Sequence, residues 1–213
     1  MKATLVAIFA AALTLLCVAP APAATMERAV FAGGCFWGMQ AVFESVRGVK
    51  HVTAGYSGGA AVTAHYDLVG TEMTGHAESV QIDFDPSQIS FNRLLDVYFL
   101  VAHDPTELNR QGPDEGSSYR SEIFYTSAEQ QREAATYIAK LERNHVFPAP
   151  IVTKLEPLKG FYPAEAYHQD YFVHNPDSGY IVANDIPKVK MLETKFPQLV
   201  NRSAAPVRVA EAR

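Results

Sequence analysis

The sequence is poor in cysteine. Only Cys17 and Cys35 occur among its 213 residues, and Cys17 lies in an N-terminal segment that we expect to be removed. The mature chain would then carry one thiol, which can form no internal disulfide and cannot complete a thiolate metal site. Because disulfides are usual in exported proteins, a single remaining cysteine indicates a reactive thiol or an intermolecular bond.

Other signals are also missing from the sequence. It has no basic cluster with interleaved aromatic residues, so we expect no nucleic acid partner. The glycine-rich stretch 55–59 lacks the Gly-Lys-Ser/Thr ending of a phosphate loop. None of the 7 histidines is paired at metal-ligand spacing on a helix, so we expect no bound metal. After residue 24 no apolar stretch is long enough to cross a membrane, and we expect no stable membrane association.

Residues 1–24 have the composition of a secretory signal peptide. Lys2 is their only charged residue, the apolar run 3–18 follows it, and the small-residue stretch Ala21-Pro22-Ala23-Ala24 comes last. We expect cleavage after Ala23 or Ala24 and export, most simply to a bacterial periplasm. A lipid anchor on Cys17 is disfavoured because the bulky Leu16 precedes it.

The stretch Gly33-Gly34-Cys35-Phe36-Trp37-Gly38 is the centre of the chain. An apolar run at 29–32 predicts a buried strand before it, and apolar residues at three- and four-residue spacing predict a helix after it. Cys35 is therefore expected at a helix N-terminus, where free N–H groups and the helix dipole lower a thiol pKa. The alternative is a buried structural cysteine; the glycine turn and the aromatic pair favour the reactive thiol.

The rest of the chain alternates between strand and helix patterns without repeats or an interior linker. This indicates one catalytic domain at 25–200, built from a sheet layer and a helix layer, and a disordered tail at 201–213. A capping box at 126–129 predicts the start of a helix that runs to about Arg143. The other predicted strands are 49–56, 80–84, 123–125 and 151–158; the other predicted helices are 90–102 and 187–196; the predicted loops are 60–77 and 103–118.

Four further residues are candidates for chemistry. Glu78 lies at the entrance of a strand, where an apolar pocket would raise its pKa and let it donate a proton, although a solvated glutamate is the simpler alternative. Tyr66 and Tyr119 could donate hydrogen bonds to a ligand, or could be ordinary core or surface tyrosines. Asp114 lies in a turn-forming stretch, and turn formation is its simpler role. His76 or His168 could pair with Cys35 as in a cysteine hydrolase, but no local feature favours this.

Together these residues closely resemble the A-class peptide-methionine sulfoxide reductases, over roughly residues 28–200. Six ordered motifs with compatible spacing make the match strong. The resemblance is carried by Gly34-Cys35-Phe36-Trp37-Gly38, Gly55-Tyr56-Ser57-Gly58-Gly59, Thr74-Gly75-His76-Ala77-Glu78, His103-Asp104-Pro105-Thr106 with Leu108-Asn109-Arg110-Gln111-Gly112, Tyr119-Arg120-Ser121, and Glu165-Ala166-Tyr167-His168-Gln169-Asp170-Tyr171.

The resemblance implies an α+β fold, a ferredoxin-like two-layer sandwich with a mixed sheet and loop extensions. It also implies reduction of methionine-S-sulfoxide, free or in proteins. Cys35 would attack the sulfoxide sulfur, and Glu78 would protonate the oxygen. In the roles implied for the other residues, Tyr66 and Tyr119 hydrogen-bond the oxygen, Phe36 and Trp37 cage the methyl group, and Asp114 helps to hold the substrate backbone.

The chain departs from the family pattern in two places. Where the family usually has Asn-Pro-Thr before Tyr66, this chain has Thr63-Ala64-His65. Many members also carry C-terminal cysteines that resolve the sulfenic acid, and this chain has none. We therefore expect the Cys35 sulfenic acid to be reduced by an external thiol: a thioredoxin-like protein, glutaredoxin or glutathione, or dithiothreitol in vitro. We also expect a monomer without a bound cofactor.

Two other functions are kept as alternatives. A one-cysteine thiol peroxidase would also form a sulfenic acid but has no need of a methyl cage and a neutral acid. A binding module for methionine-rich partners would need no catalysis, and the complete set of Cys35, Glu78 and two tyrosines argues against it. The main hypothesis assigns the chain to repair of oxidised exported proteins.

Overall fold

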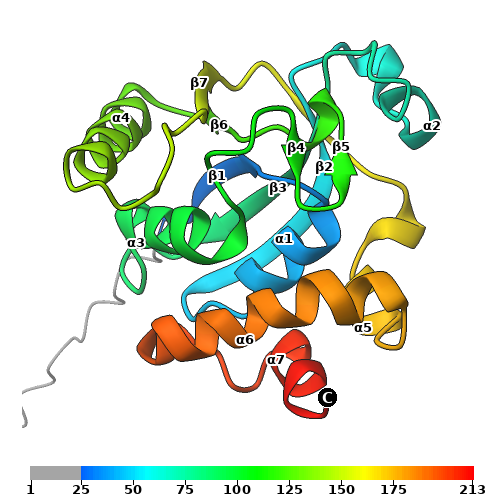
Figure 1. The fold of residues 1–213 in the computed structure, drawn as a ribbon, viewed down its shortest axis with the longest axis vertical. Coiled ribbons are helices and arrows are strands. Elements are labelled where there is room, and N and C mark those ends of the chain that lie inside the picture. The colour runs from blue at the N-terminus through cyan, green and yellow to red at the C-terminus, as the bar shows by residue number, and fades with distance from the viewer. Residues whose placement is uncertain (1–24) are drawn as a thin grey trace, which may run out of the picture.

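Six strands form one mixed sheet in the order β7-β6-β1-β3-β2-β8 (Figure 1). The computed structural model describes residues 25–213, so the predicted signal peptide and its cleavage site lie outside the described residues. Strands β6 and β7 are parallel, and the other neighbours are antiparallel. The strands are β1 Glu27–Ala32, β2 Val49–Ser57, β3 Ala77–Phe84, β6 Glu122–Tyr125, β7 Lys154–Pro157 and β8 Phe161–Pro163; a separate hairpin pairs β4 Arg110–Gln111 with β5 Asp114–Glu115.

Helices and single turns connect and cover these strands. The α-helices are α1 Phe36–Glu44, α2 Tyr66–Val69, α3 Phe91–Val97, α4 Ala128–Arg143, α5 Tyr171–His174, α6 Ile186–Lys195 and α7 Ala205–Glu211. The 3₁₀ and π turns are η1 Ala61–Thr63, η2 Tyr98–Ala102, η3 Ser117–Tyr119, η4 Ala166–His168, η5 Ile181–Asp185 and η6 Pro197–Leu199.

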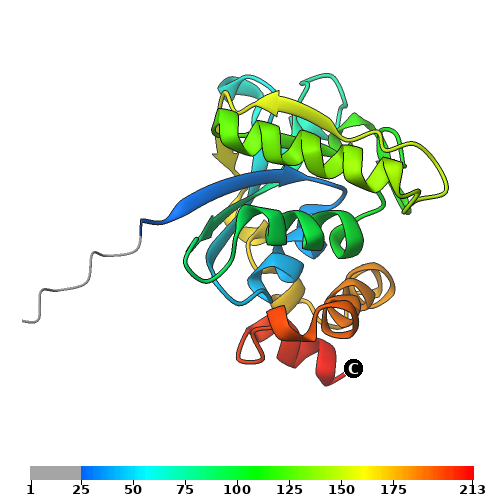
Figure 2. The same cartoon turned by 90° about the vertical axis from the view of Figure 1, so that its left-hand side faces the viewer.

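The core lies between the sheet and the helices α1 and α3. The apolar residues 29–32 of β1 are fully buried, because this central strand is covered on both faces. On the far side of α1 from the sheet, α6 and α7 form a further layer (Figure 2). The mixed sheet with segregated helices confirms the α+β prediction.

Several local predictions need correction. The capping box is displaced by one residue: Ser127, not Thr126, is the N-cap of α4, and its side chain accepts from the Gln130 N–H at 3.1 Å. The predicted helix 90–102 is α-helical only to Val97 and then widens into the π turn η2. The predicted loop 60–77 contains η1 and α2.

The prediction of a disordered tail at 201–213 is wrong. The segment forms α7, in which Val207 and Ala210 are fully buried. Two backbone contacts attach the start of the segment to the end of α1: the Asn201 N–H donates to the Ser45 carbonyl at 2.7 Å, and Val200 bridges Val46. The prediction rested on the small side chains of this segment. Alanine and valine on one face of a short helix are nevertheless sufficient to pack against α6.

Within residues 25–213, no helix combines the length and the apolar character that a membrane crossing requires. In the same part of the chain, no group of three or more histidine, cysteine or acidic side chains is arranged to hold a metal ion.

Candidate active site

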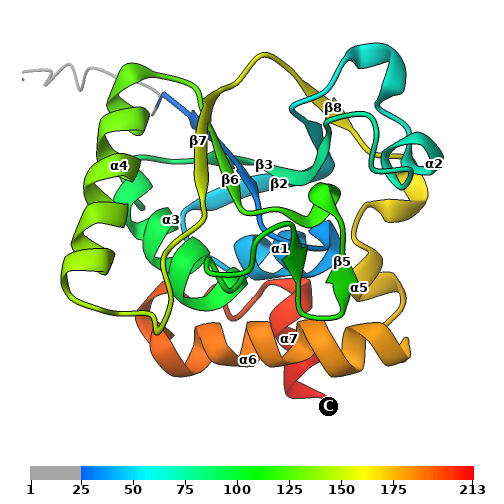
Figure 3. The ribbon, with the colours of Figure 1, turned by 45° about the horizontal axis from the view of Figure 1, so that its top comes forward.

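Cys35 lies at the junction of β1 and α1, where it is the N-cap residue of the helix. The two glycines before it are required by their surroundings. A Cβ on Gly33 would lie 2.8 Å from the His103 ring, and one on Gly34 would lie 2.5 Å from the Gln111 side chain. Gly34 also has φ of +92°, which side-chain-bearing residues rarely adopt. The predicted glycine turn is therefore confirmed, and Cys35 follows it as the residue before α1. The hairpin β4–β5, α2 and α5 lie around this end of α1 (Figure 3).

The predicted direction of the Cys35 pKa is wrong. Burial raises the pKa of the Cys35 thiol well above its usual range, and the nearby charges of Glu78 and Asp185 raise it further. A hydrogen bond from the Trp37 backbone N–H to the sulfur acts in the opposite direction but is outweighed. The helix N-terminus is present as expected, but desolvation dominates because only 7% of Cys35 is exposed.

Glu78 is buried on β3 beside the start of the same helix. Its Oε2 accepts from the Phe36 backbone N–H at 3.0 Å, so the first amide of α1 joins the carboxyl group to the residue next to the thiol. Burial raises the pKa of Glu78 to about 8; the Phe36 hydrogen bond opposes this, and the negative charges of Asp114, Glu72 and Asp185 add to it. At neutral pH the carboxyl group is therefore mostly protonated and can donate a proton.

Tyr66 and Tyr119 approach the same place from two separate segments. Tyr66 begins α2, and Tyr119 ends η3. Burial raises the pKa of both phenols, and the next cause for each is the charge of Glu78, with Cys35 also contributing. Both hydroxyl groups therefore remain protonated donors within electrostatic reach of the thiol and the carboxyl group.

Phe36 and Trp37 form an aromatic wall beside Cys35. Phe36 is buried and packs against Tyr56 with ring centroids 5.8 Å apart. The Trp37 indole stacks on Tyr171 at 3.8 Å and meets the edge of Tyr180 at 5.7 Å. The two side chains of this wall differ in exposure, because Trp37 is only half-buried and borders solvent.

Asp114 lies on β5 of the hairpin, half-buried, and its Oδ2 accepts a hydrogen bond from the Tyr180 hydroxyl group. This contact joins the hairpin to the ring that meets Trp37. Asp114 therefore does more than form a turn: it connects the hairpin β4–β5 to the aromatic wall.

The two histidines considered as partners of Cys35 are engaged elsewhere. Both ring nitrogens of His76 bind backbone, with Nδ1 accepting from the Gly59 N–H at 3.2 Å and Nε2 lying 3.0 Å from the Ala60 carbonyl. His168 Nδ1 accepts from the Trp37 indole N–H at 3.1 Å. A Cys–His pair of the hydrolase type therefore has no support in the geometry.

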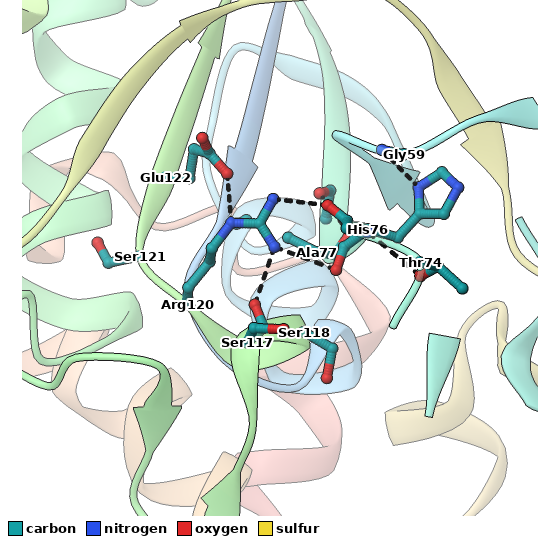
Figure 4. Close-up of polar contacts among 12 residues, drawn as sticks. Gly59, Thr74, His76, Ala77, Ser117, Ser118, Arg120, Ser121 and Glu122 are labelled. Atoms are coloured by element: carbon teal, nitrogen blue, oxygen red, sulfur yellow. Dashed lines mark hydrogen bonds and ion pairs between the residues drawn. The ribbon is translucent and has the colours of Figure 1, made fainter. Parts of the chain in front are cut away.

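Arg120 ties together the two segments that carry Glu78 and Tyr119 (Figure 4). Its guanidinium group pairs with Glu122 at 2.6 Å and donates to the carbonyls of Gly75 at 3.0 Å and His76 at 3.1 Å. It also donates to the Ser117 carbonyl at 2.9 Å, in the turn that carries Tyr119. The arginine thus fixes the turn before β3 against the turn before β6.

Two glutamates provide further ties. Glu72 accepts from the Ser118 N–H at 2.8 Å and from the Ser117 and Ser118 hydroxyl groups, which lie 45 and 46 positions further along the chain. Glu165 accepts from the Tyr66 N–H at 3.0 Å and the Tyr56 hydroxyl group at 2.9 Å. Each tyrosine donor therefore lies on a segment held by a carboxylate.

A buried ion pair lies behind the first turn of α1. Asp185 is fully buried, and its Oδ1 is 3.3 Å from the Lys188 ammonium. Burial raises the pKa of Asp185 to about 6, and Lys188 opposes the rise. A Cβ on Gly38 would lie 2.1 Å from Asp185 Oδ1, so this glycine permits the close approach.

The residues found above include several that the sequence did not single out. Asp185, Glu72 and Tyr180 gave no local signal, since each acts on a segment distant in sequence, and Lys188 pairs with Asp185. Glu165 and His168 fall in a motif that carries the resemblance; the sequence suggests no role for Glu165 and, for His168, only the pairing with Cys35 that the geometry does not support.

Comparisons with known proteins agree with this geometry. Residues 27–199 match a family model described as peptide methionine sulfoxide reductase. The chain is 54% identical over 186 residues to peptide methionine sulfoxide reductase MsrA 2 of Mesorhizobium japonicum, covering 87% of this chain and 94% of that relative. Among solved structures, Mxr1 of Saccharomyces cerevisiae in reduced form is 32% identical with a TM-score of 0.67, covering 71% of this chain and 87% of that one. Methionine sulfoxide reductase A of Corynebacterium diphtheriae is 32% identical with a TM-score of 0.62, covering 71% of this chain and 76% of that one.

Proposed function

Because this chain belongs to the peptide methionine sulfoxide reductase family, we propose that it reduces methionine-S-sulfoxide, free or in proteins, through a cycle that uses one cysteine. The observation that carries the proposal is the arrangement around Phe36. Its N–H binds a carboxyl group that is mostly protonated at neutral pH, and the residue before it is the thiol. Nucleophile and acid are thereby held at one end of one helix.

The first step reduces the substrate sulfoxide and oxidises the Cys35 thiol. The Cys35 sulfur attacks the sulfoxide sulfur while Glu78 gives a proton to the sulfoxide oxygen, with Tyr66 and Tyr119 donating hydrogen bonds to that oxygen. The sulfoxide gains two electrons and leaves as methionine; the thiol loses two electrons and becomes a sulfenic acid. The attack forms an S–S bond between Cys35 and the substrate, and the substrate S–O bond then breaks as its oxygen, carrying the thiol proton and the Glu78 proton, leaves as water. A water adds to the Cys35 sulfur, which breaks the S–S bond, frees methionine, forms the S–O bond of the sulfenic acid and returns a proton to Glu78.

A neutral Glu78 serves this step twice. It supplies the proton, and its neutrality removes a negative charge that would raise the Cys35 pKa. Because burial already disfavours the thiolate, ionisation of Glu78 would weaken both the acid and the nucleophile. The two groups therefore form one coupled unit.

The second step regenerates the thiol with an external reductant. Cys17, the only other cysteine, lies in the predicted signal peptide, so no cysteine of the mature chain can resolve the sulfenic acid. A thiol of a thioredoxin-like protein, glutaredoxin, glutathione or dithiothreitol would attack the sulfenic sulfur and release water. A second thiol would then attack the mixed disulfide and free Cys35.

The composition of residues 1–24 supports export and a role in repair of oxidised exported proteins. Sequencing the N-terminus of the exported protein tests this. A mature chain that begins at Ala24 or Thr25 is expected, whereas a cytoplasmic chain that retains Lys2 would refute it.

The decisive experiment uses the two separated methionine sulfoxide epimers, dithiothreitol and three proteins: wild type, Cys35→Ser and Glu78→Ala. We expect turnover of the S epimer alone, abolished without Cys35 and strongly slowed without Glu78. Mass spectrometry after turnover should find Cys35 as a sulfenic acid or bound to a partner thiol. Peroxide consumption by a protein that reduces neither epimer would favour the peroxidase alternative instead.

A further inference from the structure

Four large apolar side chains are exposed on or beside the segments that carry the two tyrosine donors. They are Leu68, Met73, Leu108 and Tyr167, with exposed fractions of 42%, 85%, 62% and 62%, and together they form the apolar rim. Exposed apolar side chains that are scattered singly need no explanation, but a group of them on neighbouring segments marks an interaction site. The mechanism above gives none of the four a role.

One half of the apolar rim lies beside Tyr66. Leu68 is two residues after Tyr66 on α2. Tyr167 and Tyr66 pack on the same imidazole, since the ring centroid of His168 lies 4.2 Å from that of Tyr167 and 4.5 Å from that of Tyr66. Because Tyr66 is half-buried whereas Leu68 and Tyr167 are exposed, the two rim residues lie outward of this donor.

The other half of the apolar rim lies beside Tyr119, and Gly116 connects it to that donor. The Gly116 carbonyl accepts from the Tyr119 N–H at 3.1 Å, and the Gly116 N–H donates to the carbonyl of the residue after Leu108 at 2.9 Å. A Cβ on Gly116 would lie 2.4 Å from the carboxyl group of Glu72, the residue before Met73. Leu108 and Met73 are therefore next to residues that contact the turn leading to Tyr119.

A methionine sulfoxide in a polypeptide brings its neighbours to this rim. Cys35 is only 7% exposed, so the sulfoxide side chain must enter while its backbone stays at the entrance. In an extended chain each residue advances about 3.3 Å, and side chains two positions apart point to the same side. The side chains two positions before and after the sulfoxide therefore point toward the enzyme, about 7 Å from the entering residue, whereas its immediate neighbours point away.

The charges beside the apolar rim select among such segments. Asp67 and Glu107 each precede a rim residue, and Glu115 lies on β5 of the neighbouring hairpin. The positive charge of Arg110 is shared between Glu107 and Glu115, at 3.5 Å from each. The acidic side chains outnumber this arginine, so a substrate with glutamate near the sulfoxide would be repelled.

We propose that the apolar rim binds the side chains two positions before and after a methionine-S-sulfoxide in an extended polypeptide, which makes apolar, non-acidic segments the preferred protein substrates. The inference rests on the proposed function, because it adds binding of flanking residues to the same site. These contacts are made equally in the ground state and in the transition state, so they should lower KM and leave kcat nearly unchanged.

Blocked pentapeptides with a central methionine-S-sulfoxide test the positions that are bound. One carries leucine at both ends and glycine beside the sulfoxide; a second has the same residues with leucine and glycine exchanged; a third carries glutamate at both ends. The end-leucine peptide should have a kcat/KM about tenfold above that of the exchanged peptide, through KM. The end-glutamate peptide should be the poorest substrate of the three.

Substitutions in the enzyme test whether the apolar rim is responsible. Met73→Ser and Leu108→Ser change side chains that are mostly exposed, so both variants should fold, which thermal unfolding checks. Each should reduce the preference for the end-leucine peptide about threefold, and the double variant should abolish it. Val146→Ser, at an exposed valine after α4, is the matched control and should keep the wild-type preference.

Equal kcat/KM values for the two leucine peptides in the wild type, or an undiminished preference in the double variant, would overturn the proposal. If the wild type reduces no sulfoxide, free or in a peptide, the proposed function fails instead. Calorimetric titration with the same peptides then tests the apolar rim: tighter binding of the end-leucine peptide supports it, and equal binding of the two leucine peptides overturns it.

Discussion

Cys35 and Glu78 are buried in the core, whereas Tyr66, Asp114 and Tyr119 are half-buried and lie on the short elements α2, β5 and η3. The first pair is fixed by burial, at the β1–α1 junction and on β3. In the second group, Tyr66 and Tyr119 lie on segments fixed by side chains that bind backbone, chiefly Glu165, Glu72 and Arg120, and Asp114 accepts a hydrogen bond from the Tyr180 hydroxyl group.

The difference shows how the two parts of the site can fail. Core packing fixes the nucleophile and acid through many weak contacts, so no single contact decides their place. A loop held by a few charged hydrogen bonds depends on each of them. Substitutions of Cys35 or Glu78 should change the chemistry or the stability directly. Substitutions of the side chains that bind the loop backbone should instead displace the tyrosine hydroxyl groups.

The largest effect is expected at the core acid. Glu78→Gln cannot donate a carboxyl proton, so kcat should fall by a factor on the order of 10²–10⁴. In wild type, activity should fall as the pH rises through about 8, because the pKa of Glu78 is raised to about 8 and only the protonated form donates. A pH profile of kcat/KM from 6 to 10 checks both, and the alkaline fall due to Glu78 should be absent in Glu78→Gln. An unchanged profile in the variant would assign the acid elsewhere.

The next largest effect is expected at Arg120, whose hydrogen bonds hold the two loops together. Arg120→Met leaves the buried Glu122 without its counter-charge and frees three backbone carbonyls, which should cost about 3 kcal/mol of unfolding free energy. Denaturant unfolding measures this. The double variant Arg120→Met/Glu122→Gln is the control: it should regain stability but not kcat/KM, because the carbonyls stay unbound. Full recovery of kcat/KM in the double variant would show that the loops keep their catalytic position without the hydrogen bonds from Arg120.

A smaller effect is expected behind the core helix. Gly38→Ala places a methyl group 2.1 Å from Oδ1 of the fully buried Asp185, so the carboxyl group or the helix must shift. We expect a loss of about 1–3 kcal/mol, seen as a lower Tm. Gly179→Ala is the matched control because no atom lies within 4 Å of its added Cβ; it should be neutral or slightly stabilising. Equal Tm values in the two variants would show that Asp185 can move, contrary to the packing described above.

Sequence reasoning succeeded where the information was local. The glycine turn, the strand at 49–56 and the helix to Arg143 were all found because period, glycine and capping residues specify them over a few positions. The catalytic roles of Cys35, Glu78, Tyr66 and Tyr119 remain predictions, although the structure brings these four residues together.

The failures have a common cause in long-range burial. The pKa of Cys35 depends on desolvation and on Glu78 and Asp185, which lie 43 and 150 positions further along the chain. The bond between Trp37 and His168 spans 131 positions. No local pattern predicts such contacts, and the same limit applies to the C-terminal helix α7, whose burial depends on packing against α6.

The attachment of that C-terminal helix has a consequence for protein engineering. A resolving cysteine works only if its segment can reach the sulfenic acid, and here residues 200–201 are bonded to the end of α1 opposite to Cys35 while α7 is packed against α6. Adding a cysteine to residues 205–211 would place a thiol on an anchored helix rather than on a movable arm. To make this chain self-resolving, a designer would first have to release its terminus, and the released chain would lose the burial of Val207 and Ala210.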